Sequence, residues 1–386
     1  MKYIVILGDG MADRPVPSLN NRTPLEVADK PNIDFLSQRS EVGLVQTVPL
    51  HLPAGSDVAN LSVLGYDPEE YYSGRSPLEA ASMRVSLSDT DTTFRANIVT
   101  LSDEKDYADK TMVSYSGSEI TTPEAVKLIE HLKPYIDTED LSLHAGVSYR
   151  HLLLHHDYND NSPLTPPHDI SGKKIREFLP QNEELMALMK KSYEVLKDYP
   201  GKANSLWLWG QGTKPKLASF NEKYGVKASV ISAVDLIKGI GVCSGMNIIE
   251  VPGVTGDIDT NFDGKAEAAI TALENGYNFV YLHIEAPDEC GHRFETTNKI
   301  KAIEIIDSKI VKPIYEYLKE CGEDYRILIM PDHATPLEIG THAHDAVPYM
   351  IYDSRREMTG TNYTEKDAKD LFPEAGHKLM DWFLGR

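Results

Sequence analysis

The sequence has few cysteines. Only Cys243, Cys290 and Cys321 occur among 386 residues, and they are widely separated. A small, odd and scattered set provides no disulfide framework and is typical of a protein from a reducing compartment. We therefore expect a cytoplasmic protein whose fold is stabilised by its core.

Basic residues are also scarce: 39 Lys and Arg stand against 59 Asp and Glu, which gives a formal charge of −20. Nucleic acids and anionic membranes bind basic surfaces, so we expect neither as a partner. Long apolar runs are missing as well, because none approaches the about 18 residues of a membrane helix. A small anionic substrate remains compatible, since a few arginines or metal ions can hold one.

What the sequence does contain is an alternation of buried strands and amphipathic helices. Apolar runs of strand length end in polar turns, and helical stretches at 265–276, closed by Gly276, and at 296–322, interrupted by Pro313, lie between them. This order predicts an α/β fold with a mostly parallel sheet flanked by helices. The expected strands are "YIVIL" (3–7), "NFVYLHIE" (278–285), "YRILIMPDH" (325–333) and "VPYMIYD" (347–353).

The middle of the chain has a different pattern. Residues 87–178 read as strand, helix, strand, strand, which predicts a smaller α+β domain inserted into the larger one. The larger domain would then be discontinuous, formed by 1–86 and 179–386. We expect the helix at 182–199 to lead back to its sheet through "NSLWLWGQGTKPKL".

Acidic residues and histidines follow several of the expected strands. Ligands of open α/β sheets bind beyond the carboxyl ends of the strands, so these side chains are expected to share one edge. Carboxylates together with imidazoles suit Zn²⁺ or Mn²⁺, with Mg²⁺ as the alternative, and their number suits two ions. A single Asp-His turn is more often a capped loop, but several at equivalent positions favour a metal site. The candidates are Asp9, Asp288, His292, Asp332, His333, His342 and His344.

Ser56 is the candidate nucleophile. It lies in "HLPAGSDVANLSVLGYDP" (51–68) and opens a helix-like segment whose first N–H groups could bind an anion. A serine at this place is commonly a simple N-cap. Beside a metal ion it can also be activated to attack a phosphoryl group.

Taken together, the motifs resemble the cofactor-independent phosphoglycerate mutases of the archaeal type, which belong to the alkaline phosphatase superfamily. The resemblance covers essentially the whole chain, with the motifs in order. It rests on "GDGMAD" (8–13), "PAGSDVANLSVLGYDP" (53–68), "SGRSPLEAASM" (73–83), "VSYRHLLL" (147–154), "PPHD" (166–169), "ISAVDLIKGIG" (231–241), "VPGVTGDIDTN" (251–261), "EAPDECGH" (285–292) and "MPDHATP" (330–336).

The resemblance implies a role for each candidate residue. One metal ion would be held by Asp9, Ser56, Asp332 and His333, with Ser56 as the nucleophile, and the other by Asp288, His292 and His342. His342 is preferred to His344 when "THAHDAVP" is aligned on Val347-Pro348, although Ala346 stands where the family prefers proline. Lys265 would contact the phosphoryl group. Arg75, Arg95, Arg150 and His151 would bind a carboxylate or phosphate, whereas Trp207 and Trp209 are expected to pack.

The function so implied is the interconversion of 2- and 3-phosphoglycerate through a phosphoserine intermediate at a two-metal site. The inserted domain would close over the small phosphorylated substrate and exclude water. The same motifs also resemble a homoserine kinase-like phosphotransferase of the family, and they do not separate the two activities. A metal-dependent phosphatase is a third alternative, which a substantial inserted domain disfavours.

Overall fold

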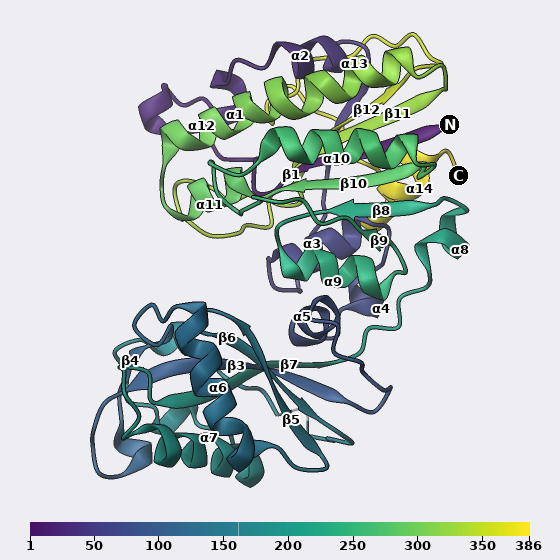
Figure 1. The fold of residues 1–386 in the computed structure, drawn as a ribbon. Helices are drawn as coiled ribbons and strands as arrows, with labels where there is room; N and C mark the ends of the chain where they lie inside the picture. The colour runs from purple at the N-terminus through teal and green to yellow at the C-terminus, as the bar shows by residue number, and fades with distance from the viewer. Residues whose placement is uncertain (161) are drawn as a thin grey trace. The chain divides into compact units, whose positions relative to one another are not determined.

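The computed structural model describes residues 1–160 and 162–386. The chain forms two compact units: unit 1 comprises Met1–Tyr72 and Lys216–Arg386, and unit 2 comprises Ser73–Pro215 (Figure 1). Unit 2 therefore extends beyond the insert of 87–178 that the sequence suggested. Residues 73–86 and 179–215, which we assigned to the larger domain, belong to unit 2.

Unit 1 contains a seven-stranded sheet that confirms the mostly parallel α/β fold. Among the described strands of this sheet, only β12 runs against the others. In spatial order the strands are β2 (Glu41–Val45), β12 (Val347–Asp353), β11 (Tyr325–Met330), β1 (Lys2–Gly8), β10 (Phe279–Ile284), β8 (Ala228–Ile231) and β9 (Asn247–Ile248).

Helices cover both faces of this sheet (Figure 1). Ile4 and Ile6 of β1 face a core that α10, α12 and α13 complete, whereas Tyr3 points to the other face and contacts Phe383 edge-on. Such two-sided burial explains why β1 reads as a continuous apolar run. The helices of unit 1 are α1 (Pro24–Val27), α2 (Pro31–Ser37), α3 (Ser56–Val63), α4 (Pro68–Tyr71), α8 (Phe220–Tyr224), α9 (Asp235–Cys243), α10 (Phe262–Glu274), α11 (Ala286–His292), α12 (Thr296–Ile305), α13 (Lys312–Glu320) and α14 (Leu379–Leu384).

The helix expected at 296–322 continues past Pro313 instead of stopping there. A π-helical segment, Ile306–Val311, joins α12 to α13, and Pro313 lies in the first turn of α13. The altered winding accommodates a residue that cannot donate a backbone hydrogen bond. Gly276 behaves as predicted: it follows α10 with φ of +82°, a backbone conformation that favours glycine.

Unit 2 is a five-stranded sheet with two helices on one face. β3 (Thr92–Leu101) is central, and β7 (Ser205–Thr213) pairs along it from Thr92 to Val99. The apolar side of α7 (Glu183–Leu196), with Leu185, Met189 and Leu196, shares one core with β3. These contacts explain why 179–215 belongs to this unit. Its other elements are α5 (Ser76–Ser82), β4 (Met112–Ser114), α6 (Thr122–Ile136), β5 (Leu141–Val147) and β6 (Arg150–His155).

Short 3₁₀ turns complete both units, at Pro17–Leu19, Tyr107–Asp109, Pro167–Ile170, Arg176–Phe178 and Gly376–Lys378. Within residues 1–160 and 162–386, no helix combines the length and the apolar character needed to cross a bilayer.

A buried ion pair ties the loops after β1 and β11 to α12. Lys299 Nζ lies 2.7 Å from Asp13 Oδ2 and donates to the carbonyl of Thr335 at 2.8 Å. Both side chains are essentially inaccessible to solvent. Neither charge can be rehydrated if its partner is lost, so the pair constrains the loops that carry the polar residues of the sheet edge.

We predict that Lys299→Met destabilises the protein by about 3–5 kcal/mol, because it leaves the Asp13 carboxylate buried without its partner. Urea unfolding followed by circular dichroism measures the change. Lys301→Met is the matched control, since Lys301 lies on the same helix but is exposed. A loss as small as that of the control would show that the Asp13 charge is compensated elsewhere.

Candidate active site

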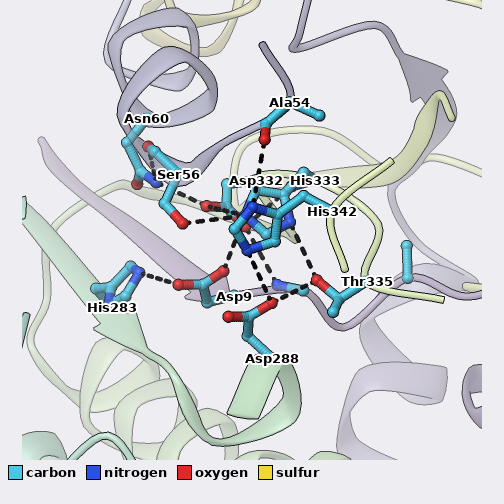
Figure 2. A network of polar contacts seen from close by, with 12 residues as sticks. Asp9, Ala54, Ser56, Asn60, His283, Asp288, Asp332, His333, Thr335 and His342 are labelled. Atoms are coloured by element: carbon cyan, nitrogen blue, oxygen red, sulfur yellow. Dashed lines mark hydrogen bonds and ion pairs between the residues drawn. The ribbon is translucent and has the colours of Figure 1, made fainter. Parts of the chain in front are cut away.

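Three carboxylates meet at the carboxyl edge of the unit 1 sheet (Figure 2). Asp9 follows β1, Asp332 follows β11, and Asp288 lies on α11, which begins just after β10. Gly10 makes this approach possible: it has φ of +58°, and a Cβ at this position would lie 2.5 Å from Asp288 Oδ1. The edge is the one at which parallel α/β sheets bind ligands.

The first group consists of Asp9, Asp332 and His333, all buried, and one ligand atom of each lies within 4.8 Å of the others. His333 Nε2 is 3.4 Å from Asp9 Oδ1 and 3.5 Å from Asp332 Oδ2. Ser56 Oγ joins the group at 3.1 Å from the same nitrogen. Gly55, and not Ser56, is the N-cap of α3, so Ser56 is free of the capping role that the sequence left open.

The second group consists of Asp288, His292 and His342. Asp288 and His292 stand four residues apart on α11, one turn of helix, with 3.1 Å between Oδ2 and Nε2. His342 comes from the loop between β11 and β12 and brings its Nε2 to 3.1 Å from that of His292. His344 is not in the group, because its Nε2 contacts the carbonyl of Leu52.

Hydrogen bonds orient the three histidine rings in the same way. Nδ1 of His292 contacts the carbonyl of Gly340 at 2.9 Å, and Nδ1 of His342 contacts that of Ala54 at 3.3 Å. Carbonyls only accept, so both Nδ1 atoms carry the proton. Nδ1 of His333 faces Thr335 Oγ1, whose own proton goes to Asp288. In the neutral rings, every Nε2 therefore presents a lone pair to the carboxylates, an arrangement that fits divalent cations.

The electrostatics of the first group also fit a cation. Burial raises the pKa of Asp9 well above its ordinary value, and the charges of Asp332 and Asp288 raise it further. Within the described part of the chain, Asp9 Oδ1 has no hydrogen-bond partner. A bound cation would supply the missing positive charge and satisfy this oxygen.

In the second group, a proton on His292 supplies the positive charge next to Asp288. The hydrogen bond with Asp288 raises the pKa of His292 to about 9, although partial burial opposes it. Burial alone would raise the pKa of Asp288, but its contacts with His292 and His342 hold that pKa well below its ordinary value. Asp288 therefore stays ionised over a wide pH range.

Three residues that the sequence analysis missed support the two groups. Thr335 connects them, as described above. His283 lies on β10 with Nε2 3.0 Å from Asp9 Oδ2 and Nδ1 3.2 Å from Ser232 Oγ. Burial lowers its pKa to about 3, so the ring is neutral. Asn60, on α3, donates to Asp332. In the sequence, the one sign that Asn60 lies near the site was its position four residues after Ser56, which places both on the same side of a helix.

Lys265 lies behind the site. Its side chain is fully buried, and Nζ donates to the carbonyl of His283 at 2.9 Å. Burial lowers its pKa to about 8. The structure thus gives Lys265 a contact with β10, and the expected contact with a phosphoryl group stays a prediction.

The remaining predicted residues lie in unit 2. Glu79 on α5 brings two of them together, at 3.4 Å from Arg75 and 3.0 Å from Arg95. The Arg95 guanidinium also stacks 4.3 Å above the ring of Trp209. Burial lowers the pKa of Arg95, and the charges of Arg75 and Arg150 lower it further. Trp209 is therefore a platform for an arginine as well as a packing residue.

Arg150 and His151 point to opposite faces of the unit 2 sheet, since they are consecutive on β6. The register pairs Arg150 with Asn97, which shares a face with Arg95, and pairs His151 with Ala96 on the helix-covered face. Arg150 is exposed, whereas His151 is buried and its Nδ1 accepts from a backbone N–H. The structure therefore does not bring His151 together with the arginines.

Comparison with known proteins agrees with this site. A profile of the 2,3-bisphosphoglycerate-independent phosphoglycerate mutases matches residues 37–201. A probable enzyme of that name from Geobacter sulfurreducens is 46% identical over the full length of both chains. One from Methanosarcina barkeri is 47% identical, covering 98% of this chain and 95% of its own. The chain belongs to the 2,3-bisphosphoglycerate-independent phosphoglycerate mutase family.

Solved structures confirm the fold of this family. A Pyrococcus horikoshii protein superposes with a TM-score of 0.80 and 28% identity, covering 99% of this chain and 96% of its own. The cofactor-independent phosphoglycerate mutase of Thermoplasma acidophilum superposes with a TM-score of 0.68 at 24% identity, over 100% and 99% of the two chains. The expected α/β fold with a mostly parallel sheet is thereby confirmed. The names of the relatives favour a mutase, an enzyme of the isomerase class, over the kinase and phosphatase alternatives.

We predict that His292 titrates with a midpoint near pH 9 when divalent cations are removed. Because its pKa is raised, the ring is charged below this midpoint, and a cation must displace the proton to bind. Affinity for the cation at this group should therefore fall as the pH is lowered from 9. Histidine NMR in the presence of EDTA measures the midpoint, and a His292→Gln spectrum assigns the signal.

Diamagnetic Zn²⁺ should abolish the titration of His292 over the same pH range. His51 is the internal control, since it is exposed and belongs to neither group. A midpoint for His292 near the ordinary value of about 6.5 would contradict the close pairing with Asp288.

Proposed function

We propose that this family member interconverts 2- and 3-phosphoglycerate through a phosphoserine intermediate at Ser56. The observation that carries the proposal is the position of Ser56 Oγ, 3.1 Å from His333 Nε2 and at the start of α3, against two groups that could hold metal ions. A hydroxyl so placed is suited to nucleophilic attack on a phosphoryl group. The names of relatives that match nearly the whole chain support the substrate.

Two divalent cations fit the donor set. Asp9, Ser56, Asp332 and His333 would hold one, and Asp288, His292 and His342 the other. When bound, the ions would neutralise the phosphoryl oxygens and favour the ionised form of the serine hydroxyl. Mixed carboxylate and imidazole ligands favour Mn²⁺ or Zn²⁺, with Mg²⁺ as the alternative.

The start of α3 prepares Ser56 for its role. Its Oγ lies 3.1 Å from His333 Nε2, and Asn60 Nδ2 donates to the carbonyl of Ser56 at 2.8 Å. One of the first N–H groups of the helix, that of Val58, is already occupied by Asp57 Oδ1. Fewer N–H groups of this helix end are therefore available to bind an anion than the sequence suggested. The metal ions and side chains around Ser56 would have to stabilise more of the negative charge of the phosphoryl group.

The reaction consists of two transfers that balance each other. In the first, a bond forms between phosphorus and Ser56 Oγ while the ester bond to the glycerate oxygen breaks; the serine hydroxyl loses its proton and the glycerate oxygen gains one. In the second, the other hydroxyl of the glycerate loses its proton and attacks the phosphoserine, and the released Oγ regains a proton. Water would compete with the glycerate in the second transfer, so the enzyme must exclude it.

We propose that the arginines of unit 2 bind the carboxylate or phosphate of the substrate. Arg75 and Arg95 both contact the carboxylate of Glu79, and Trp209 holds the Arg95 guanidinium in place. Arg150 lies on the same face of the sheet. A bidentate contact with the anionic substrate follows from guanidinium geometry. The separate core of unit 2 supports the expected closing motion, because such a unit can move as a body.

A cytoplasmic location also belongs to this proposal. Within residues 1–160 and 162–386, Cys290 and Cys321 form no disulfide, which supports a reducing compartment.

We predict that Mn²⁺-loaded protein converts 3-phosphoglycerate into 2-phosphoglycerate, as measured by ³¹P NMR, and that removal of divalent cations with EDTA abolishes the conversion. Without cations the carboxylates of Asp9 and Asp332 would face the incoming phosphate uncompensated. Re-addition of Mn²⁺ should restore the rate. A metal-free protein with full activity would contradict the two-metal site. Conversion of homoserine and ATP into phosphohomoserine, with 3-phosphoglycerate unchanged, would contradict the mutase.

We predict that Ser56→Ala lowers the mutase rate by at least about 10³-fold, since it removes the group that carries the phosphoryl. The fold and the metal content, measured by circular dichroism and mass spectrometry of the metals, should be retained. Ser62→Ala is the matched control, because Ser62 is a buried serine of the same helix. If Ser56→Ala were as active as the control, Ser56 would not be the nucleophile.

A further inference from the structure

Asn60 connects the helix of the nucleophile to the first metal group. Its side chain is fully buried on α3. Nδ2 donates to the carbonyl of Ser56 at 2.8 Å and to Asp332 Oδ2 at 2.7 Å. Asn60 therefore contacts both the residue that would carry the phosphoryl group and a carboxylate that would hold a metal ion, although it belongs to neither group itself (Figure 2).

The orientation of this amide follows from its partners. The carbonyl of Ser56 and the carboxylate of Asp332 both only accept, so the nitrogen must face them. The amide oxygen then faces the hydroxyl of Tyr281, which donates to Oδ1 at 2.5 Å. All the hydrogen-bonding groups of the amide are used, and a rotated amide would place oxygen against oxygen.

Tyr281 holds the amide from the opposite side. It lies on β10, is fully buried, and points to the same face of the sheet as His283, two residues along the strand. Burial raises the pKa of its hydroxyl well above the ordinary value, so it remains a donor at every working pH. The chain of contacts therefore runs from a rigid central strand, through Asn60, to Asp332 and Ser56.

The orientation of the Asp332 carboxylate depends on Asn60, because its two oxygens have different hydrogen-bond partners. Oδ1 accepts from the backbone N–H groups of Gly10 and His333. Oδ2 accepts from Asn60 and also faces His333 Nε2, the side on which a cation would bind. The contact with Asn60 fixes the direction of the remaining lone pair of Oδ2. A neutral amide does so without adding charge to a site that already holds three carboxylates.

We propose that Asn60, locked by Tyr281, is a positioning residue that sets the geometry between the Ser56 nucleophile and the Asp332 metal ligand. The inference rests on the proposed function for its effect on phosphoryl transfer, but its effect on metal binding can be measured without any substrate. Groups that orient a ligand in this way typically change metal affinity or activity by about 10–100-fold when they are removed.

The test compares Asn60→Leu and Tyr281→Phe with wild type. Leucine is similar in size to asparagine and favours the helix, but it leaves Asp332 Oδ2 without its donor. We expect Mn²⁺ calorimetry to show one of two binding steps weakened by about 10–100-fold, and kcat to fall by a similar factor. At a Mn²⁺ concentration that saturates each variant, KM for 3-phosphoglycerate should stay within about 2-fold, because no substrate-binding group changes. Tyr281→Phe removes the hydrogen bond that orients the Asn60 amide but keeps the amide itself. We therefore expect a smaller loss of Mn²⁺ affinity and kcat, roughly 3- to 10-fold.

Tyr66→Phe is the matched control. Tyr66 is a fully buried tyrosine of the same unit whose hydroxyl donates to the carbonyl of Ala218 at 2.7 Å, outside the metal groups. Removing either hydroxyl costs a buried hydrogen bond, so both Tyr→Phe variants should show similar shifts in melting temperature. Only Tyr281→Phe should weaken Mn²⁺ binding and lower kcat, measured well below the melting temperature.

The proposal would be overturned if Tyr281→Phe and Asn60→Leu kept the Mn²⁺ affinity and kcat of the wild type. It would also be overturned if their losses were no larger than those of Tyr66→Phe. Should Asn60→Leu fail to fold, Tyr281→Phe decides alone. The failure of the proposed function is distinguishable: a wild-type protein that binds Mn²⁺ without converting 3-phosphoglycerate would contradict the mutase, while the affinities of the variants would still test the role of Asn60.

Discussion

The repulsion among three buried carboxylates is the constraint on which the site depends. Asp9, Asp288 and Asp332 converge from three strand ends, and burial together with the charges of Asp332 and Asp288 raises the pKa of Asp9. Three imidazole rings add lone pairs directed at the same place, because hydrogen bonds fix the proton of each ring on Nδ1. Such an arrangement is unfavourable unless positive charge enters it. The fold must therefore hold the groups rigidly, and a divalent cation is the natural complement.

Rigidity comes from a second layer of polar residues built on β10. Successive side chains of a strand alternate between faces, so Tyr281 and His283 share one face beneath the site. Tyr281 acts on Asp332 through Asn60, and His283 lies against Asp9. Lys265 contacts the carbonyl of the same strand from α10. Tyr281 and His283 place polar atoms in a buried strand that is otherwise apolar. The free energy needed to bury these polar atoms is understandable if the strand serves the metal site.

The sequence predicted the parts of the site that are local in the chain. Asp288 and His292 are one helical turn apart, and Asp332 and His333 are adjacent after a strand, so their spacing indicated a shared role. The contact of Asn60 with Tyr281 joins residues far apart in the chain, and the face chosen by His151 depends on strand register, so neither could be derived from spacing. Unit 2 is larger than the expected insert for the same reason: β7 pairs with β3, which lies much earlier in the chain.

The strongly acidic composition and an anionic substrate are compatible only because charge is distributed locally. A net charge of −20 would repel phosphoglycerate on average. On unit 2 the arginines near Glu79 are the positive charges proposed to bind the substrate. Cations at the sheet edge would reverse the sign of the potential around Ser56. We therefore expect productive binding to require metal, because the metal-free protein presents carboxylates to the substrate. Dependence on metal thus acts at the binding of the substrate as well as at the transfer of its phosphoryl group.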